Sequence, residues 1–248
     1  MLLPKKKNRR SLMRELKGSS LEERDRISQF IQAFQRDNAS FLENIREEAQ
    51  KEAVPIIRDE TAALLRVCLE MKKPNSILEL GTAVGYSGLL MLDSLKGKTK
   101  LCTVENFPER IIKSKENFAK SPYNDSIRLL EGDGGEILER LVKEREHFDF
   151  VFLDAAKAQY PLWLPKILEL LNPEGVLFCD NILQENLLLE SRFFVERRQR
   201  TIHKRMREFL WMLKENPELE NSIIPIGDGV SISIKKKQRK ENANQIDE

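Results

Sequence analysis

From residue 76 onward, short apolar runs alternate with segments whose apolar residues recur at helical spacing. The runs are nearly continuous in Ile, Leu, Val and Phe, as strands of a parallel sheet covered on both faces require. The predicted strands cover 76–80, 100–105, 127–131, 148–154 and 176–180, and the helices between them cover 86–95, 108–119, 135–144 and 160–171. This order predicts an α/β fold of the Rossmann-like, doubly wound kind.

The last part of the chain adds a helix and a hairpin. Residues 201–214 have helical spacing, and a turn at 227–229 joins two apolar runs, 223–226 and 230–234. A short turn rich in glycine between two such runs is typical of a hairpin. The expected sheet therefore has seven strands, mostly parallel, with an antiparallel edge strand.

Three helices are expected ahead of the first strand, beginning near Ser20, Asp37 and Pro55. Ser and Asp are favoured at helix N-caps, and Pro is favoured in the first turn. No glycine-rich linker follows these helices, so they are expected to form one layer of the same domain. The predicted organisation is a basic flexible arm over 1–18, one domain over 19–235 with N-terminal helices in 19–73 and a core in 76–235, and a charged tail over 236–248.

The composition of the 248-residue chain, with 40% hydrophobic residues, is sufficient for one substantial core. No apolar run reaches the roughly 18 residues of a membrane span, and the start lacks the apolar region of a secretory signal. Cys68, Cys102 and Cys179 have no paired spacing, and His147 and His203 lie far apart. These features argue against disulfides and zinc and predict a cytoplasmic protein without a membrane partner.

Basic residues are clustered although the formal net charge is only +2. The clusters lie at 5–10, 192–207 and 235–240. Such clusters can bind the phosphates of a nucleic acid, but they can equally form solvated faces and tails. Charge alone leaves these two interpretations open.

A glycine turn directly follows the strand predicted at 76–80. Gly81 and Gly85 let a backbone approach a ligand closely, although any strand–helix unit can need such glycines. Glu105 ends the next strand, 24 positions after Gly81, where an acidic residue is expected to bind the ribose hydroxyls of a nucleotide-like cofactor. The spacing G-x-x-x-G argues against NAD.

Three oxygen-bearing side chains follow two later strands. Asp154 ends one strand, and Asp180 with Asn181 ends the next. Because parallel strands end at the same edge of a sheet, these side chains can converge, and their oxygens suit Mg²⁺, Mn²⁺ or Ca²⁺. The alternative is that Asp180 and Asn181 only cap the following segment.

These motifs together resemble the class I S-adenosylmethionine-dependent O-methyltransferases, in the divalent-metal branch that includes catechol and caffeoyl-CoA enzymes. The resemblance covers about residues 50–235 and rests on 77–87 (ILELGTAVGYS), Glu105, 131–133 (EGD), 152–157 (FLDAAK), 159–160 (QY) and 180–181 (DN). Within that branch, the segments 54–56 (VPI), 197–202 (RRQRTI) and 224–230 (IPIGDGV) resemble bacterial tRNA 5-hydroxyuridine methyltransferases most.

The resemblance implies a role for each matched residue. Cofactor binding would involve Val54, Glu79, Gly81, Thr82, Ser87, Glu105, Asp133 and Asp154; the metal would be bound by Asp154, Asp180 and Asn181; and Lys157 and Asp154 would lie at the reacting groups. Glu79, Gly81, Thr82 and Ser87 would hold the methionine part, Glu105 the ribose, and Asp133 would lie near the adenine. Two departures from the family pattern are Gly134, where alanine is usual, and Ala158, where glycine is common.

The expected function is methylation of 5-hydroxyuridine at the tRNA wobble position to 5-methoxyuridine, using S-adenosylmethionine and Mg²⁺ and contacting the anticodon loop. The alternative is an O-methyltransferase of small catechol-like molecules, because a catechol offers the metal a similar pair of oxygens. A third alternative is a non-catalytic RNA-binding protein. The intact set of Glu105, Asp154, Asp180 and Asn181 argues against it. The resemblance also implies a homodimer.

Overall fold

The computed structural model describes residues 34–184, 187–191 and 193–237. The chain divides into two compact units, 1–37 and 38–248, and the second carries the site. The predicted basic arm, nearly all of the first predicted helix and residues 238–248 of the predicted tail lie outside the described residues.

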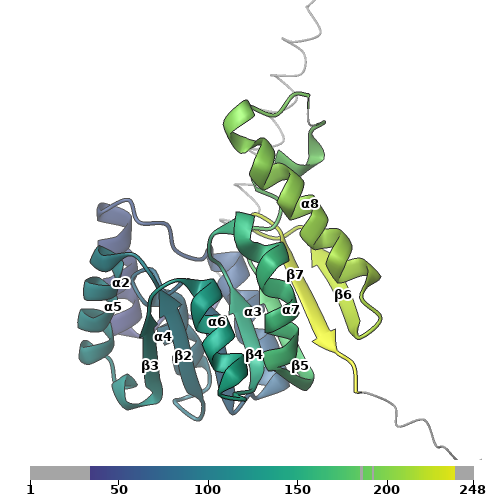
Figure 1. Cartoon of the computed structure of the whole chain (residues 1–248). Helices are drawn as coiled ribbons and strands as arrows, with labels where there is room; N and C mark the ends of the chain where they lie inside the picture. The colour runs from purple at the N-terminus through teal and green to yellow at the C-terminus, as the bar shows by residue number, and fades with distance from the viewer. Residues whose placement is uncertain (1–33, 185–186, 192, 238–248) are drawn as a thin grey trace, which may run out of the picture. The chain divides into compact units, whose positions relative to one another are not determined.

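The second unit is built on one seven-stranded sheet with the order β3-β2-β1-β4-β5-β7-β6 (Figure 1). β1 lies between β2 and β4, and β1 to β5 are parallel. β7 pairs antiparallel with both β5 and β6, so the predicted hairpin forms the antiparallel edge. The strands are β1 (Ser76–Leu80), β2 (Lys100–Glu105), β3 (Ile127–Glu131), β4 (Phe148–Leu153), β5 (Leu171–Cys179), β6 (Leu219–Ile224) and β7 (Val230–Lys235). The predicted seven-stranded, mostly parallel sheet is confirmed.

Helices cover both faces of the sheet (Figure 1). Successive strand residues point to opposite faces, so Ile77 and Phe150 belong to one apolar core while Leu78 and Val151 belong to the other. The first core includes α2 (Ser40–Lys51), α3 (Asp59–Lys72), α4 (Tyr86–Ser94) and α5 (Pro108–Lys120); the second includes α6 (Gly134–Lys143), α7 (Tyr160–Leu170) and α8 (Arg200–Glu215). Within the described residues, none of the helices is long and apolar enough to cross a membrane.

The third predicted helix begins later than expected. Residues 54–58 form an irregular connection, and α3 starts at Asp59 rather than at Pro55. Asp59 and Glu60 then stand in the first turn, where negative charge is favourable because the helix dipole is positive there. The predicted helix start at Pro55 was therefore wrong, and part of the irregular connection 54–58 lines the cavity described below.

Candidate active site

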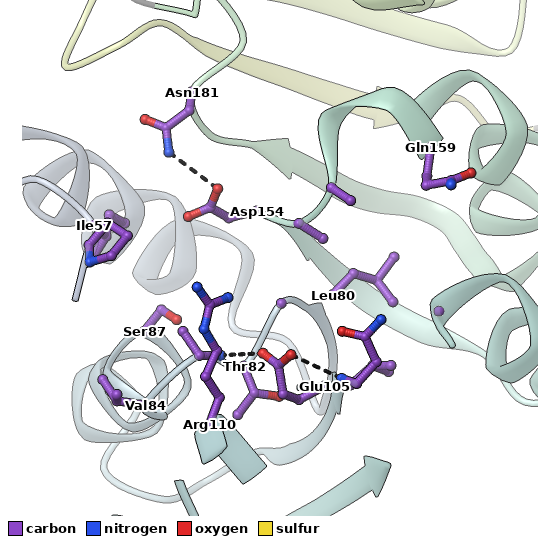
Figure 2. Close-up of a pocket in the computed structure, with 18 of the residues that line it drawn as sticks. Ile57, Leu80, Thr82, Val84, Ser87, Glu105, Arg110, Asp154, Gln159 and Asn181 are labelled. Carbon is purple, nitrogen blue, oxygen red and sulfur yellow. Dashed lines mark hydrogen bonds between the residues drawn. The ribbon is translucent and has the colours of Figure 1, made fainter. Parts of the chain in front are cut away.

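A cavity of about 480 Å³ opens at the carboxyl ends of β1, β2 and β4. Because β1 lies at the centre of the sheet and its neighbours on the two sides carry helices to opposite faces, this edge is the switch point where ligands bind in such folds. The lining comprises residues 55–57, 80–84, 86–87, 104–106, 110, 132–134, 154–156, 159, 163 and 181. It includes residues predicted for the cofactor and residues predicted for the metal (Figure 2).

The glycine turn is fixed by close contact between neighbouring strands. The backbone of Gly81 has φ +106°, and a Cβ there would lie 2.1 Å from the carbonyl oxygen of Asp154. The backbone N–H groups of Gly81 and Thr82 both donate to the carbonyl of Val104, at 3.1 Å. The turn is thus held between β4 and β2, and only glycine fits at position 81.

Glu79 lies beneath the turn and does not line the cavity. It is fully buried, and its carboxylate accepts hydrogen bonds from the hydroxyls of Ser87 and Thr103, both at 2.5 Å. Ser87 itself lines the cavity. Glu79 is therefore placed to orient Ser87, and its predicted contact with the cofactor stays a prediction. Burial raises the pKa of Glu79 to about 7, although the two hydroxyls oppose that shift.

This raised pKa predicts a pH effect on stability. The folded protein holds the Glu79 proton up to about pH 7, whereas the unfolded chain releases it near the ordinary pKa of 4.5. The protonated Glu79 side chain contributes to the free energy of unfolding in full below pH 4.5, and this contribution is lost as the pH rises to about 7. The loss amounts to about 3 kcal/mol, at about 1.36 kcal/mol per pKa unit. Urea unfolding of the Glu79→Gln variant should match the wild type near pH 5 and exceed it at pH 8. A constant difference between the two proteins across that range would contradict the raised pKa.

Glu105 presents a fixed carboxylate to the cavity. Its Oε2 accepts from the backbone N–H of Ala83 at 2.9 Å, and its Oε1 accepts from that of Asn106 at 2.9 Å (Figure 2) and from that of Phe107 at 3.0 Å. The side chain is almost fully buried yet lines the cavity. A carboxylate held by three N–H groups is a rigid acceptor, as recognition of ribose hydroxyls requires.

Asp133 has a structural task in addition to its place in the cavity lining. Its Oδ1 accepts from the backbone N–H groups of Gly135 and Glu136, at 2.8 and 3.2 Å, and so caps the start of α6. The adjacent Gly134 explains one departure from the family pattern. A Cβ at position 134 would lie 2.8 Å from the indole ring of Trp163, which also lines the cavity.

The contact between Gly134 and Trp163 gives a direct prediction. Alanine usually stabilises a helix relative to glycine by about 1 kcal/mol, but Gly134→Ala should instead lower the free energy of unfolding by about 1–2 kcal/mol through overpacking. In a Trp163→Leu background, where the clash is absent, Gly134→Ala should cost much less than it does in the wild type. Urea unfolding of the wild type, both single variants and the double variant checks this, and the idea is wrong if Gly134→Ala alone is as stable as the wild type.

The acidic end of the cavity is organised around Asp154. Its Oδ1 accepts from the amide Nδ2 of Asn181 at 3.2 Å (Figure 2) and also from the Nζ of Lys157 at 2.7 Å. Lys157 also donates to the Tyr160 hydroxyl and to the carbonyl of Asp180, at 2.9 and 3.0 Å. The side chains of Asp154 and Asn181 therefore meet here, and Lys157 joins them, while the metal role predicted for Asp154, Asp180 and Asn181 stays a prediction.

Burial and neighbouring charges shift the pKa values of Asp180 and Lys157 at this end of the cavity. Burial, reinforced by the negative charge of Asp154, raises the pKa of Asp180 to about 7. Burial would lower the pKa of Lys157, but Tyr160 and Asp154 raise it above its ordinary value, so the amine is protonated at neutral pH.

Oxygen donors of the right kind for Mg²⁺ are present. Asp154 and Asp180 supply carboxylates, and Asn181 supplies an amide oxygen. Among the described residues, no group of three His, Cys, Asp or Glu side chains could hold a metal ion, so the Asn181 amide would be a necessary ligand. The donor set fits a divalent cation that prefers oxygen.

Several cavity residues were not predicted from the sequence. Arg110 points into the cavity from the first turn of α5, and Gln159 reaches it from the segment before α7 (Figure 2). Tyr86 and Trp163 line it from α4 and α7. Tyr86 and Gln159 lie within motifs that carry the family resemblance, which was the available signal for them; Arg110 and Trp163 lie inside helices and had none. Val54 is not in the lining and packs against the core, whereas residues 55–57 line the cavity, so its cofactor contact stays a prediction.

Comparison with known proteins agrees with this geometry. A catechol O-methyltransferase from Niastella koreensis is 27% identical over 178 residues, which cover 69% of this chain and 78% of that protein. A methyltransferase from Podospora anserina, solved with SAH bound, has a TM-score of 0.78 at 24% identity and covers 96% and 99% of the two chains. An O-methyltransferase from Bacillus cereus in complex with SAH has a TM-score of 0.75 at 21% identity, covering 85% and 97%.

The two solved structures lie below 25% identity and therefore establish the shared fold. The assignment to a family rests on a sequence match to a family model. Residues 32–236, most of the chain, match the family model described as O-methyltransferase. With a sheet-edge cavity that holds Glu105 and Asp154 together, the chain belongs to the O-methyltransferase family.

Proposed function

We propose that this O-methyltransferase uses S-adenosylmethionine and Mg²⁺ to methylate a hydroxyl that has a second oxygen beside it. One observation carries the proposal: a single cavity joins the fixed carboxylate of Glu105 to the oxygen donors Asp154 and Asn181. Glu105 suits a ribose, and the donors suit a hard cation. A cofactor and a metal-chelating acceptor could therefore meet in the same space.

The residues of the chain would divide the chemistry between them. When bound, S-adenosylmethionine supplies an electrophilic methyl group, and Mg²⁺, held by Asp154, Asp180 and Asn181, supplies a Lewis acid that favours an ionised hydroxyl. Lys157 is already protonated and held by Asp154, so it suits electrostatic stabilisation of an oxyanion better than removal of a proton. The Gly81 turn would let the cofactor approach the backbone closely.

The acceptor we favour is 5-hydroxyuridine at the wobble position of tRNA, converted to 5-methoxyuridine. Its 5-hydroxyl and neighbouring 4-carbonyl oxygen offer a vicinal pair to a metal. Support comes from the segments 54–56, 197–202 and 224–230 and from four exposed basic side chains around the start of α8. These are Arg197, Arg198, Lys204 and Arg207. A tRNA would meet such charges with its phosphates.

A small catechol-like molecule is the second candidate. The observation in its favour is the similarity to the catechol O-methyltransferase from Niastella koreensis. A catechol has the same vicinal pair of oxygens, so the metal donors serve either acceptor. The basic residues near α8 would then be a solvated surface.

A direct assay separates the two acceptors. The protein is incubated with labelled S-adenosylmethionine, Mg²⁺ and one of three acceptors: an anticodon stem-loop containing 5-hydroxyuridine, the same stem-loop with uridine, or catechol. We expect label to enter the 5-hydroxyuridine stem-loop and not the uridine control. Label entering catechol alone would refute the tRNA assignment.

Removal of divalent metal should abolish turnover without abolishing cofactor binding. After treatment with a chelator, activity is expected to fall at least about 100-fold, since a Lewis acid contributes several kcal/mol to such a step. Calorimetric titration should still show cofactor binding because Glu105 and the Gly81 turn do not depend on the metal donors. Undiminished activity after chelation, with the metal content verified by elemental analysis, would show that catalysis needs no metal.

A further inference from the structure

The segment between β5 and α8 displays two adjacent aromatic side chains to solvent. Phe193 is 88% exposed and Phe194 is 82% exposed, and Leu189 nearby is 73% exposed. Single exposed apolar residues are common on protein surfaces, but clusters of large ones mark interaction sites. These exposed apolar side chains therefore indicate an interaction site.

Neighbouring residues anchor this segment to the protein. Leu188 and Val195, on either side of the aromatic pair, are both buried. His203 Nε2 lies 3.0 Å from the carbonyl of Glu190, and the Nε of Arg200 donates to the carbonyl of Val195 at 3.1 Å. Both anchoring side chains belong to α8. The exposure of Phe193 and Phe194 is thus a property of an anchored backbone.

The same surface carries an excess of positive charge. Residues 193–208 contain six Arg and Lys residues and two Glu residues. Arg197 and Arg198 come three and four residues after Phe194 and are exposed. Arg198 pairs with Glu196 at 2.8 Å, but such a pair on the surface contributes little and can be exchanged for another anion. Exposed aromatic rings and exposed arginines therefore lie within six residues of each other in the chain.

This surface is connected to the catalytic end of the cavity. The guanidinium of Arg205, on α8, donates to the carbonyl of Ala158 at 2.6 Å, one residue after Lys157. β5 ends directly before the candidate metal ligands Asp180 and Asn181, and the start of α8 lies beyond the carboxyl edge of the sheet (Figure 1). An acceptor bound at this surface would therefore lie near the residues proposed to act on it.

We propose that Phe193 and Phe194 stack on unpaired bases of the RNA loop that presents the acceptor, while Arg197 and Arg198 contact its phosphates. This inference rests on the proposed tRNA substrate. Unpaired bases in RNA loops are commonly recognised by stacking on aromatic and arginine side chains, and phosphates add a salt-dependent attraction. A second copy of this chain would bring the same basic residues against each other, which makes RNA the better match in charge.

The test compares aromatic, aliphatic and truncated side chains in the full-length protein. Variants with both phenylalanines changed to Ala, Leu or Tyr are titrated with a fluorescent anticodon stem-loop containing 5-hydroxyuridine. Met71→Ala, an exposed apolar residue on α3 at the opposite face of the sheet, is the matched control. Cofactor titration and sedimentation on the same preparations establish folding and oligomeric state.

We expect the Ala and Leu variants to bind the stem-loop at least about tenfold more weakly, because each stacked base contributes roughly 1–3 kcal/mol. The Tyr variant should bind like the wild type, and so should Met71→Ala. If the wild type methylates the stem-loop and the Ala variant binds it as tightly as the wild type does, the inference is overturned. Loss of a dimer in the Ala variant and its retention in the Leu variant would identify a second copy as the partner. If the wild type neither binds nor methylates the stem-loop, the proposed function itself fails.

Discussion

Replacing Gly81 by alanine should cost about 4 kcal/mol or more of unfolding free energy and abolish cofactor binding. Two effects add at this position. The backbone has φ +106°, which L-residues avoid, and the new Cβ would lie 2.1 Å from the carbonyl oxygen of Asp154. Backbone cannot give way as a flexible side chain can, so β1 and β4 would have to separate. Urea unfolding and calorimetric titration with S-adenosylmethionine measure the two losses.

Gly132 provides a matched control for this prediction. It also has positive φ, +138°, but the nearest atom to a Cβ there is the Cδ1 of Ile137 at an ordinary 3.7 Å. Gly132→Ala should therefore cost only backbone strain, about 1–2 kcal/mol. If the two variants are equally destabilised, strain alone explains the requirement for glycine at position 81 and the contact with Asp154 contributes nothing.

The strands were predictable because each buried strand is a nearly continuous apolar run. Their residues pack on both faces, so local pattern and tertiary environment agree, as for 148–153, where the predicted strand matches β4 within one residue. Pro55 shows where local preference fails. Proline is favoured in a first helical turn, but residues 55–57 instead form an irregular segment that lines the cavity. Their conformation is set by the tertiary fold rather than by the local sequence.

The site was predictable to the extent that chemistry follows strand ends. Glu105, Asp154 and Asn181 lie at or just beyond the carboxyl ends of parallel strands and meet at one cavity. Glu79 shows the limit of this rule, because alternation along β1 turns its side chain beneath the turn, where it bonds Ser87 and Thr103. Trp163 shows another limit. It reaches the cavity from within a helix, and only its contact with Gly134 in three dimensions reveals why alanine is absent there.

Asp154→Asn should reduce kcat/KM by about 1000-fold, which corresponds to about 4 kcal/mol of transition-state stabilisation. The variant loses a charged oxygen donor from the candidate metal site and the counter-charge of Lys157, whose amine lies 2.7 Å away. The assay uses the 5-hydroxyuridine stem-loop or catechol, whichever the wild type methylates. Activity within a few-fold of the wild type would show that Asp154 is no metal ligand.

The same substitution should also destabilise the protein, and a second change separates the two losses. The side chain of Lys157 is only 12% exposed and that of Asp154 28% exposed, so an uncompensated amine there should cost about 2 kcal/mol once partial screening by water is allowed for. Adding Lys157→Gln removes the charge and keeps a donor for the carbonyl of Asp180. The double variant should regain stability in urea but no activity. If it stays as unstable as Asp154→Asn alone, the charge of Lys157 is not the cause; if activity returns with stability, neither Asp154 nor Lys157 is needed for turnover.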